Sequence, residues 1–340
     1  MREENNRKKK AIVRKKRKFS FKLLIGFLIF QIIFTGITAP FVLLYGPFET
    51  AKKTFLGTAM DSMHYQWLAT MFMSEEKINE ILGHNLESNE EIESSEDIVK
   101  LPTSNNNNIK FYTIEGTDGA KFNGYVLEIA NPKRVKVGYS SKLGIEGEKT
   151  SEIAEHNDAI AAINGGAFTD SSNGEAWTQN GGMPTGLIIS EGKEIFSDIS
   201  DKNKKYPCAL INDEGLLIGG NFSYNEIQKM NIKEGLTFGP LLISGGKKVT
   251  NFKEAGTAPK TLIGQKVDGT MVLVVLDSST ETRLCANLRE AQDVMYKLGC
   301  VTAINLDGGK STTMYYDGEV VNNPSNTTGE RTIASGFIVK

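Results

Sequence analysis

The segment VTAINLDGGKSTT (residues 301–313) is the densest group of polar residues in the chain, and it directly follows an apolar run typical of a buried strand. The pair Gly308-Gly309 lets the backbone approach a ligand closely and direct N–H groups at an anion. Asp307 adds a carboxylate at the mouth of the loop. A positive charge and two hydroxyls come next in the chain: Lys310, Ser311 and Thr312. The pattern indicates a phosphate or phosphodiester site beside a carboxylate, and a plain hairpin with an Asp-Gly-Gly turn is the alternative.

A similar pattern occurs earlier in the chain, at AAINGG (residues 161–166). In both places a short apolar strand ends in Asn and runs into a Gly-Gly loop. LIISEGKEI (residues 187–195) likewise resembles LLISGGKKV (residues 241–249). Two related halves would bring both loops to one cleft, whereas short apolar runs and Gly turns also recur by chance. The first loop adds three candidates that supply an amide and backbone donors: Asn164, Gly165 and Gly166.

Two further segments carry charged candidates. In GERT (residues 329–332), Arg331 can bind a phosphate bidentately and Glu330 can act as an acid or base, unless the two form an exposed ion pair. In APKT (residues 258–261), Lys260 comes just before a strand and is either a phosphate ligand or a solvated side chain.

From residue 109 onward, short apolar runs separated by turn signals predict an α+β domain with hairpin-rich mixed sheets and few helices. We expect one helix from Thr150 or Ser151 through His156. A second helix is expected from about Cys285 to Leu298, with Gly299 as its stop. Hairpins are expected in four segments: 122–140 (turning at Asn131-Pro132), 208–220, 262–277 and 313–322.

The net charge of −2 hides an asymmetry, because residues 1–22 hold eleven Lys and Arg against two Glu, which is +9. The 26 residues from Leu23 to Phe48 carry no charge and are long enough to cross a hydrocarbon core of about 30 Å. By the positive-inside rule we expect an uncleaved anchor in residues 23–48, with a cytoplasmic tail (residues 1–22) and the rest outside the cell. A cleaved signal peptide is the alternative, disfavoured by the length of the apolar region and by Pro40 after Thr38-Ala39. The basic tail then sets topology, and no nucleic-acid partner is expected.

The remaining expectations concern domains and cofactors. Residues 49–82 predict a membrane-proximal helix, residues 83–108 an acidic linker, and residues 109–340 the folded domain. Three cysteines rule out a disulfide scaffold and are expected as buried thiols. Three histidines far apart argue against a His-based zinc site. No cofactor is expected, although Asp307 together with phosphate oxygens could hold a divalent ion; the oligomeric state is not decided.

The motifs occur in the order found in the phosphodiester glycosidase family, which the chain resembles over about residues 109–340. They are AAINGGAF, FGPLLISGG, APKTLIG, LGCVTAINLDGGKSTTMYYDG and GERTIASGFIV. The resemblance implies cleavage of a sugar-1-phosphodiester bond on an α+β fold. Three motifs depart from the usual family pattern. Lys310 stands in place of a third Gly and Thr312 in place of Ser, Lys260 replaces Arg, and Asp277-Ser278-Ser279 replaces Asp-Gly-Arg.

We therefore expect a membrane-anchored extracytoplasmic hydrolase that cleaves glycosyl phosphodiesters of surface polysaccharides, with a non-catalytic glycan-phosphodiester-binding module as the alternative. The expected catalytic residues are Asp307, Glu330 and Asn164. Substrate and phosphate binding is assigned to Gly165, Gly166, Lys260, Asn305, Gly308, Gly309, Lys310, Ser311, Thr312 and Arg331.

Overall fold

The computed structural model describes residues 21–49, 98–102, 106–116, 122–169, 180–252, 256–278, 285–325 and 329–340, together with part of the segment between residues 51 and 81. The chain divides into two units, residues 1–52 and residues 53–340. Each unit is described by itself.

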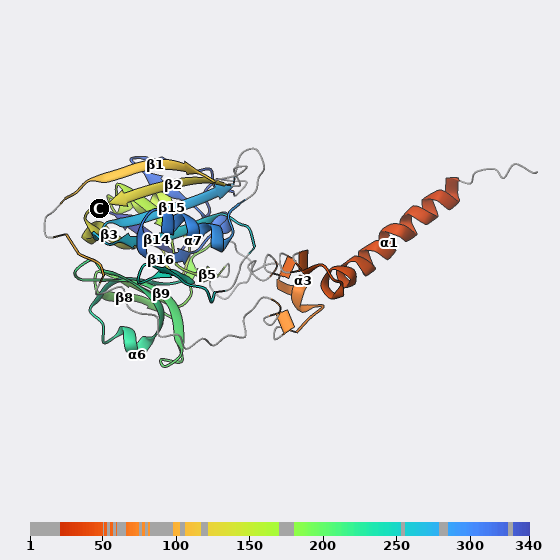
Figure 1. Ribbon diagram of the computed structural model, residues 1–340, viewed down its shortest axis with the longest axis horizontal. Coiled ribbons are helices and arrows are strands. Elements are labelled where there is room, and N and C mark those ends of the chain that lie inside the picture. The colour runs from red at the N-terminus through yellow and green to blue at the C-terminus, as the bar shows by residue number, and fades with distance from the viewer. Residues whose placement is uncertain are drawn as a thin grey trace, which may run out of the picture. The chain divides into compact units, whose positions relative to one another are not determined.

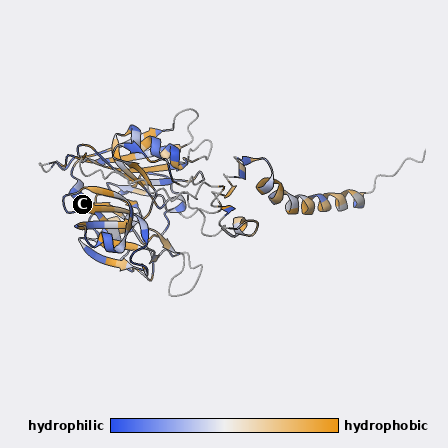
Figure 2. Cartoon of the chain, turned by 60° about the horizontal axis from the view of Figure 1, so that its bottom comes forward, coloured by the Kyte–Doolittle hydropathy of each residue, from blue (hydrophilic) through white to orange (hydrophobic). Residues whose placement is uncertain are grey.

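The first unit contains one long helix, α1 (Phe21–Tyr45), which includes Pro40. Its sequence is hydrophobic nearly throughout, and much of the helix is orange in Figure 2. Within the described residues, the 22-residue stretch Leu24–Tyr45 is the one helical segment long and apolar enough to cross a membrane, judged by length and composition.

The membrane-proximal helix expected over residues 49–82 is interrupted. A short helix, α3 (Gln66–Thr70), is followed by a turn at Met71–Ser74. Most of the expected acidic linker, residues 83–97, lies outside the described residues. Part of its C-terminal section contacts the domain, because the N–H of Lys100 donates to the carbonyl of Val267 at 2.6 Å.

The second unit is built mainly from three larger sheets and one small one, and every strand pair among the described residues is antiparallel. The seven-stranded sheet has the order β1 (Ile109–Glu115), β2 (Phe122–Ile129), β15 (Met271–Ser278), β14 (Lys260–Lys266), β16 (Cys300–Leu306), β12 (Leu241–Ser244) and β13 (Lys247–Lys248). The helix α7 (Leu288–Lys297) contacts β12, β14 and β16 of this sheet (Figure 1).

A five-stranded sheet has the order β10 (Leu217–Ser223), β9 (Lys205–Asn212), β11 (Ile232–Thr237), β7 (Leu187–Ser190) and β8 (Lys193–Ser197), with α6 (Tyr224–Ile227) after β10. The other has the order β18 (Glu319–Val320), β17 (Met314–Tyr316), β4 (Ala161–Asn164), β19 (Ser335–Val339) and β3 (Val135–Tyr139), and α5 (Thr150–His156) packs on it. The small sheet pairs β5 (Phe168–Thr169) with β6 (Met183–Pro184).

The main hydrophobic core is shared by the three larger sheets. Leu273 of the seven-stranded sheet, Ile188 of β7 and Phe337 of β19 belong to one cluster of buried side chains. Burying apolar area at this common centre is the main force that brings the sheets together. Separate clusters lie beneath α7 and α5, with Met295 and Ile153 among their fully buried members. The α+β class expected from the sequence is confirmed.

Three of the four expected hairpins are present, as β9–β10, β14–β15 and β17–β18. The fourth is wrong, because β2 and β3 belong to different sheets. A 3-10 turn over Pro132–Arg134 separates them, and the Asn131 side chain accepts the N–H of Lys133 at its start. This turn redirects the chain, so the two strands do not return along each other.

The two expected helices exist with shifted starts. The helix α7 begins at Leu288, because Asn287 accepts the N–H of Glu290 and caps it; Gly299 has a φ of +83° just beyond its end. The cap of α5 is Lys149, one residue before the expected cap, and Glu152 accepts the N–H of Lys149.

All three cysteines are buried free thiols, as expected. Burial raises the pKa of both Cys208 and Cys300 to about 12, because the thiolate would lose its hydration there.

Candidate active site

The two Gly-Gly loops meet, although their strands belong to different sheets. The strand β4 ends at Asn164 and β16 ends at Leu306. Just beyond these ends, the N–H of Asp307 donates to the carbonyl of Gly165 at 3.0 Å. The side-chain amide of Asn164 donates to the carbonyl of Asp307. The loop after β4 (the first corner, residues 164–168) and the loop after β16 (the second corner, residues 305–313) therefore form one structure around Asp307.

Asn164 holds this junction from inside the protein. Its side chain is fully buried, and its Oδ1 accepts the Thr261 hydroxyl at 2.7 Å and the N–H of Thr313 at 3.1 Å. The Oδ1 atom thus has two donors, and the amide nitrogen holds the Asp307 main chain. None of the Asn164 surface is exposed, which favours a supporting role, and the catalytic role expected from the sequence stays a prediction.

The backbone donors of the corners are largely used within the fold. The N–H groups of Gly165 and Gly166 donate to the carbonyl of Ser335 at 3.1 and 3.3 Å, and that of Gly309 donates to Pro259 at 2.9 Å. The N–H groups of Gly165 and Gly166, expected from the sequence as donors to an anion, thus bind a carbonyl of the fold, and their role in substrate binding stays a prediction. A Cβ at Gly166 would lie 2.3 Å from the Ser335 hydroxyl oxygen, so its absence permits the close packing of the first corner on β19.

The three expected cations differ in accessibility. Lys260 is only 5% exposed, and its ammonium donates to the carbonyls of Ala258 at 2.9 Å and Gly256 at 3.4 Å. Lys310 is exposed, on the 3-10 turn Gly309–Ser311 of the second corner. The Arg331 guanidinium lies 4.9 Å from the centre of the Phe168 ring, beside the first corner. Lys310 and Arg331 are therefore better placed to meet an incoming anion than the buried Lys260.

Glu330 is bound to the start of α5. Its carboxylate accepts the N–H of Ser151 at 3.0 Å and the Ser151 hydroxyl at 2.6 Å. A carboxylate at a helix N-terminus satisfies otherwise unpaired N–H groups and interacts favourably with the helix dipole. These contacts favour a structural role for Glu330, and a catalytic role stays a prediction.

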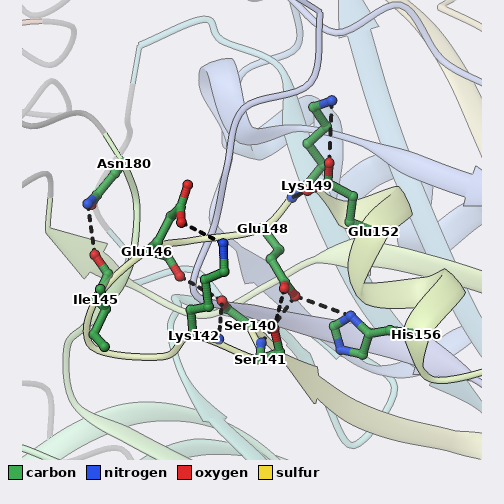
Figure 3. A network of polar contacts seen from close by, with 10 residues as sticks. All are labelled: Ser140, Ser141, Lys142, Ile145, Glu146, Glu148, Lys149, Glu152, His156 and Asn180. Atoms are coloured by element: carbon green, nitrogen blue, oxygen red, sulfur yellow. Dashed lines mark hydrogen bonds and ion pairs between the residues drawn. The ribbon is translucent and has the colours of Figure 1, made fainter.

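A second network holds the loop before α5. Glu148 accepts the N–H and hydroxyl of Ser141 and lies 3.2 Å from Nδ1 of His156, as Figure 3 shows. Together with Glu330, this network fixes both ends of α5. The helix in turn packs against β4, which carries the first corner.

Several buried polar atoms around the corners make no hydrogen bond within the described part of the chain. They are Oδ1 of Asn305 and the hydroxyl oxygens of Thr312, Thr313 and Ser335. Buried polar atoms in native proteins are nearly always paired, so each exception needs an explanation. Most of these exceptions in the described part of the chain lie at the two corners or in β19 beside them, as is typical of a functional site, and Thr150 and Glu234 hold two others.

The sequence alone did not reveal the role of Asp277. This carboxylate is 1% exposed at the end of β15 and accepts the N–H groups of Asn323 at 2.6 Å and Ser278 at 2.7 Å. Burial raises its pKa, and these hydrogen bonds oppose the shift. Asn322 donates to Asp277 at 3.4 Å and to the carbonyl of Thr312 at 3.1 Å, so Asp277 supports the second corner. Its signal is a carboxylate at the end of an apolar run.

Within the described residues, no group of three or more His, Cys, Asp and Glu side chains is arranged to hold a metal ion. The corners are thus built from one half-buried carboxylate, hydroxyls, amides and nearby cations, a set suited to an anionic ester.

The family model for phosphodiester glycosidases matches residues 157–340, which contain both corners. The chain belongs to the phosphodiester glycosidase family. Human N-acetylglucosamine-1-phosphodiester alpha-N-acetylglucosaminidase is 28% identical over 193 residues, covering 51% of this chain and 35% of the human protein. The SPbeta prophage-derived uncharacterized protein YomE of Bacillus subtilis is 24% identical over 161 residues, covering 45% of this chain and 25% of YomE. The chain thus spans about a quarter to a third of the length of these relatives.

Solved structures support the fold of this family member. One is the catalytic domain of the zebrafish N-acetylglucosamine-1-phosphodiester alpha-N-acetylglucosaminidase, auto-inhibited by its pro-peptide. It superimposes with a TM-score of 0.54 at 22% identity, and the match covers 68% of this chain and 82% of the zebrafish chain. A hypothetical protein from Synechocystis has a TM-score of 0.50 at 16% identity, covering 68% of this chain and 62% of its own.

Proposed function

We propose that this protein hydrolyses the bond between the anomeric carbon of a sugar and the phosphodiester oxygen of a glycosyl phosphodiester. The observation that carries the proposal is the contact of the two corners at Asp307, inside the region that matches the family model. The names of the human and zebrafish relatives make N-acetylglucosamine-1-phosphodiesters the first substrates to test.

In the proposed reaction, the bond between the anomeric carbon and the phosphate oxygen breaks and a water molecule supplies the new hydroxyl at that carbon, either directly or after a covalent intermediate with Asp307. The leaving group is a phosphate monoester, which is stable as an anion and needs cationic stabilisation more than a strong acid. Lys310 and Arg331 supply that charge. Asp307 acts on the oxocarbenium-like transition state, either as the nucleophile or as the base that removes a proton from water.

The other expected residues act by positioning in this proposal. Asn164 fixes the Asp307 main chain, and Asn305 donates to the carbonyl of Gly239 at 3.0 Å. Glu330 caps α5 behind the first corner. Such supporting contacts matter because displacing a reacting group by about 1 Å can cost on the order of 100-fold in rate.

The test uses the full chain in detergent micelles with the methyl phosphodiester of α-N-acetylglucosamine 1-phosphate. Release of methyl phosphate is followed by phosphorus NMR, and free sugar by a reducing-end assay. Asp307→Asn should abolish both products, whereas Asp213→Asn, an exposed acid in the β9–β10 turn, should not change them. Equal turnover in the wild type and Asp307→Asn would exclude the proposed role of Asp307.

A non-catalytic glycan-phosphodiester-binding module is the second candidate. It is favoured by the departures from the family pattern at Lys310 and Ser278 and by the use of the Gly165 and Gly166 N–H groups inside the fold. Binding of the same diester without turnover by the wild type, with loss of binding in Arg331→Ala, would support this candidate against the hydrolase.

We further propose that α1 anchors the domain in the cell membrane, with the basic residues 1–22 in the cytoplasm and the domain acting on surface polysaccharide. The support is the length and apolar character of α1 and the charge asymmetry of its flanks. Protease added to intact cells should digest the domain and spare the N-terminal tail; the reverse pattern would invert the topology.

A further inference from the structure

A cavity of about 490 Å³ opens at the end of β11, outside the residues expected from the sequence. Its described lining includes Ala167, Asp198, Tyr206, Pro207, Phe238 and Gly239. Its size falls within the range of roughly 300–1,000 Å³ that is usual for small-molecule sites.

The cavity adjoins both corners of the candidate active site. Ala167, in its wall, directly follows Gly166 of the first corner. Gly239, another lining residue, accepts at its carbonyl a hydrogen bond from the side-chain amide of Asn305 in the second corner at 3.0 Å. Leu236 of β11 also packs against Gly165, where an added Cβ would lie 2.8 Å from its Cδ1. A ligand that fills the cavity therefore lies next to the corners that carry Asp307.

The charge of the cavity disfavours a phosphate. Among its described lining residues, Asp198 is the one ionisable acid, and neither Lys nor Arg is present. Asp198 accepts the N–H of Gly186 at 2.8 Å, so this backbone donor is already used. A carboxylate without a neighbouring cation in the wall repels an anion but accepts hydrogen bonds from hydroxyl groups. The cavity is thus suited to a neutral, hydroxyl-rich group.

The apolar lining matches one face of a sugar ring. Tyr206 and Phe238 supply aromatic surface. Pro207 adds an apolar ring that packs closely on Gly239, because a Cβ added at Gly239 would lie 2.6 Å from the Cβ of Pro207. A pyranose has a face of C–H groups that packs on such surfaces and a rim of hydroxyls that needs polar partners. Asp198 and Thr185 provide polar groups in the same lining.

The walls are held in place before any ligand binds. The Thr237 hydroxyl accepts the N–H of Leu187 at 2.9 Å and donates to the carbonyl of Thr185 at 3.2 Å. Gly186 has a φ of +81°, and a Cβ there would lie 1.9 Å from the Thr237 hydroxyl oxygen. A pre-formed site loses little conformational entropy on binding.

We propose that this cavity binds the sugar ring of the substrate, while the phosphate lies toward Lys310 and Arg331. The assignment of the bound ring as the one that is cleaved from phosphate rests on the proposed function. The division follows from charge: the cavity lining holds an acid and aromatic rings, whereas Lys310 and Arg331 are not among its lining residues.

The test measures binding directly, by ligand-observed NMR on the full chain in a sugar-free zwitterionic detergent. The probes are N-acetylglucosamine, glucose and inorganic phosphate. Phe238→Ala should weaken sugar binding about tenfold, and Asp198→Asn should weaken it by a smaller factor, because aromatic contacts of this kind contribute about 1.4 kcal/mol. Neither variant should change phosphate binding. The matched controls are Tyr296→Ala, an aromatic residue 49% exposed on α7, and Asp213→Asn.

Each outcome separates the two proposals. Unchanged sugar affinity in Phe238→Ala, or competition between phosphate and sugar that Phe238→Ala relieves, overturns the inference. If the wild type binds sugar through Phe238 but cleaves no glycosyl phosphodiester, the cavity assignment stands and the proposed hydrolysis fails. If Phe238→Ala cleaves the diester with an unchanged KM, hydrolysis stands and the cavity assignment fails.

Discussion

Replacing Asn164 by Ala should destabilise the domain more than any other single change at the junction of the corners. The substitution removes three hydrogen bonds, to the Asp307 carbonyl, from the Thr261 hydroxyl and from the N–H of Thr313. A net contribution of about 1 kcal/mol for each gives about 3 kcal/mol, and leaving buried partners unpaired raises the loss toward about 5 kcal/mol. Against a total free energy of unfolding of about 5–15 kcal/mol, that is a large fraction.

A double-mutant cycle isolates one of these bonds. Thr261→Val keeps the shape of a fully buried side chain and removes its hydroxyl, which should cost about 1–2 kcal/mol. Because Asn164→Ala already removes the partner of that hydroxyl, the double variant should be less destabilised than the sum of the single variants by about 1 kcal/mol.

The assay is thiol labelling in increasing urea, on the full chain in micelles. The chain has only three cysteines, all buried in the second unit, so labelling reports unfolding of the domain and ignores α1. A loss below about 1 kcal/mol in Asn164→Ala, or additivity within about 0.3 kcal/mol in the cycle, would refute the role given to this network.

Three further predictions follow from single observations. In native protein near pH 8, Cys208 and Cys300 should react with a thiol reagent far more slowly than in urea, because their pKa values are raised to about 12 by burial; rapid labelling of both without denaturant would contradict this. The pKa of Asp277 is raised in the folded state, so the native state binds more protons than the unfolded state, and the free energy of unfolding should fall as pH rises from about 3.8 through the folded pKa. Urea midpoints measured across this interval should fall less steeply with pH in Asp277→Asn than in the wild type. An equal fall in both proteins would contradict the prediction. Gly308→Ala should destabilise the domain more than Gly309→Ala, because a Cβ at Gly308 meets the Pro259 carbonyl at 2.6 Å. Gly309 has a φ of +61° and open space around it, so Gly309→Ala should lower the free energy of unfolding by only about 1 kcal/mol. Equal urea midpoints of the two variants would disprove the difference.

Local patterns predicted the hairpins whose turn residues lie between adjacent strands, such as Asp268-Gly269 between β14 and β15. They failed at Asn131-Pro132, because the choice between a hairpin and a crossing to another sheet depends on which core each strand fills. Tertiary packing decides between the two, and a sequence window of about ten residues does not contain that information.

For the candidate site, the sequence left open whether the two Asn–Gly-Gly patterns bring their loops to one cleft, and the structure shows that the loops meet at Asp307. The direction of their donors could not be predicted. The N–H groups of Gly165 and Gly166 are used by Ser335, which lies far along the chain, and the carboxylate of Glu330 is used by Ser151. Asp277 was noted only within a segment that departs from the family pattern, and its burial and its contact with Asn322 show that it supports the second corner.

The position of β19 has a consequence for biosynthesis. This strand lies between β3 and β4, and its first residue, Ser335, supplies the carbonyl that holds Gly165 and Gly166. During synthesis, the segments around β4 must wait for residues 335–339 before their sheet can close and the first corner can take its shape. Until then β4 presents an unpaired edge, a surface prone to association with other chains. A chain cut short just before Ser335 should therefore accumulate as aggregate rather than as a folded protein with a damaged site.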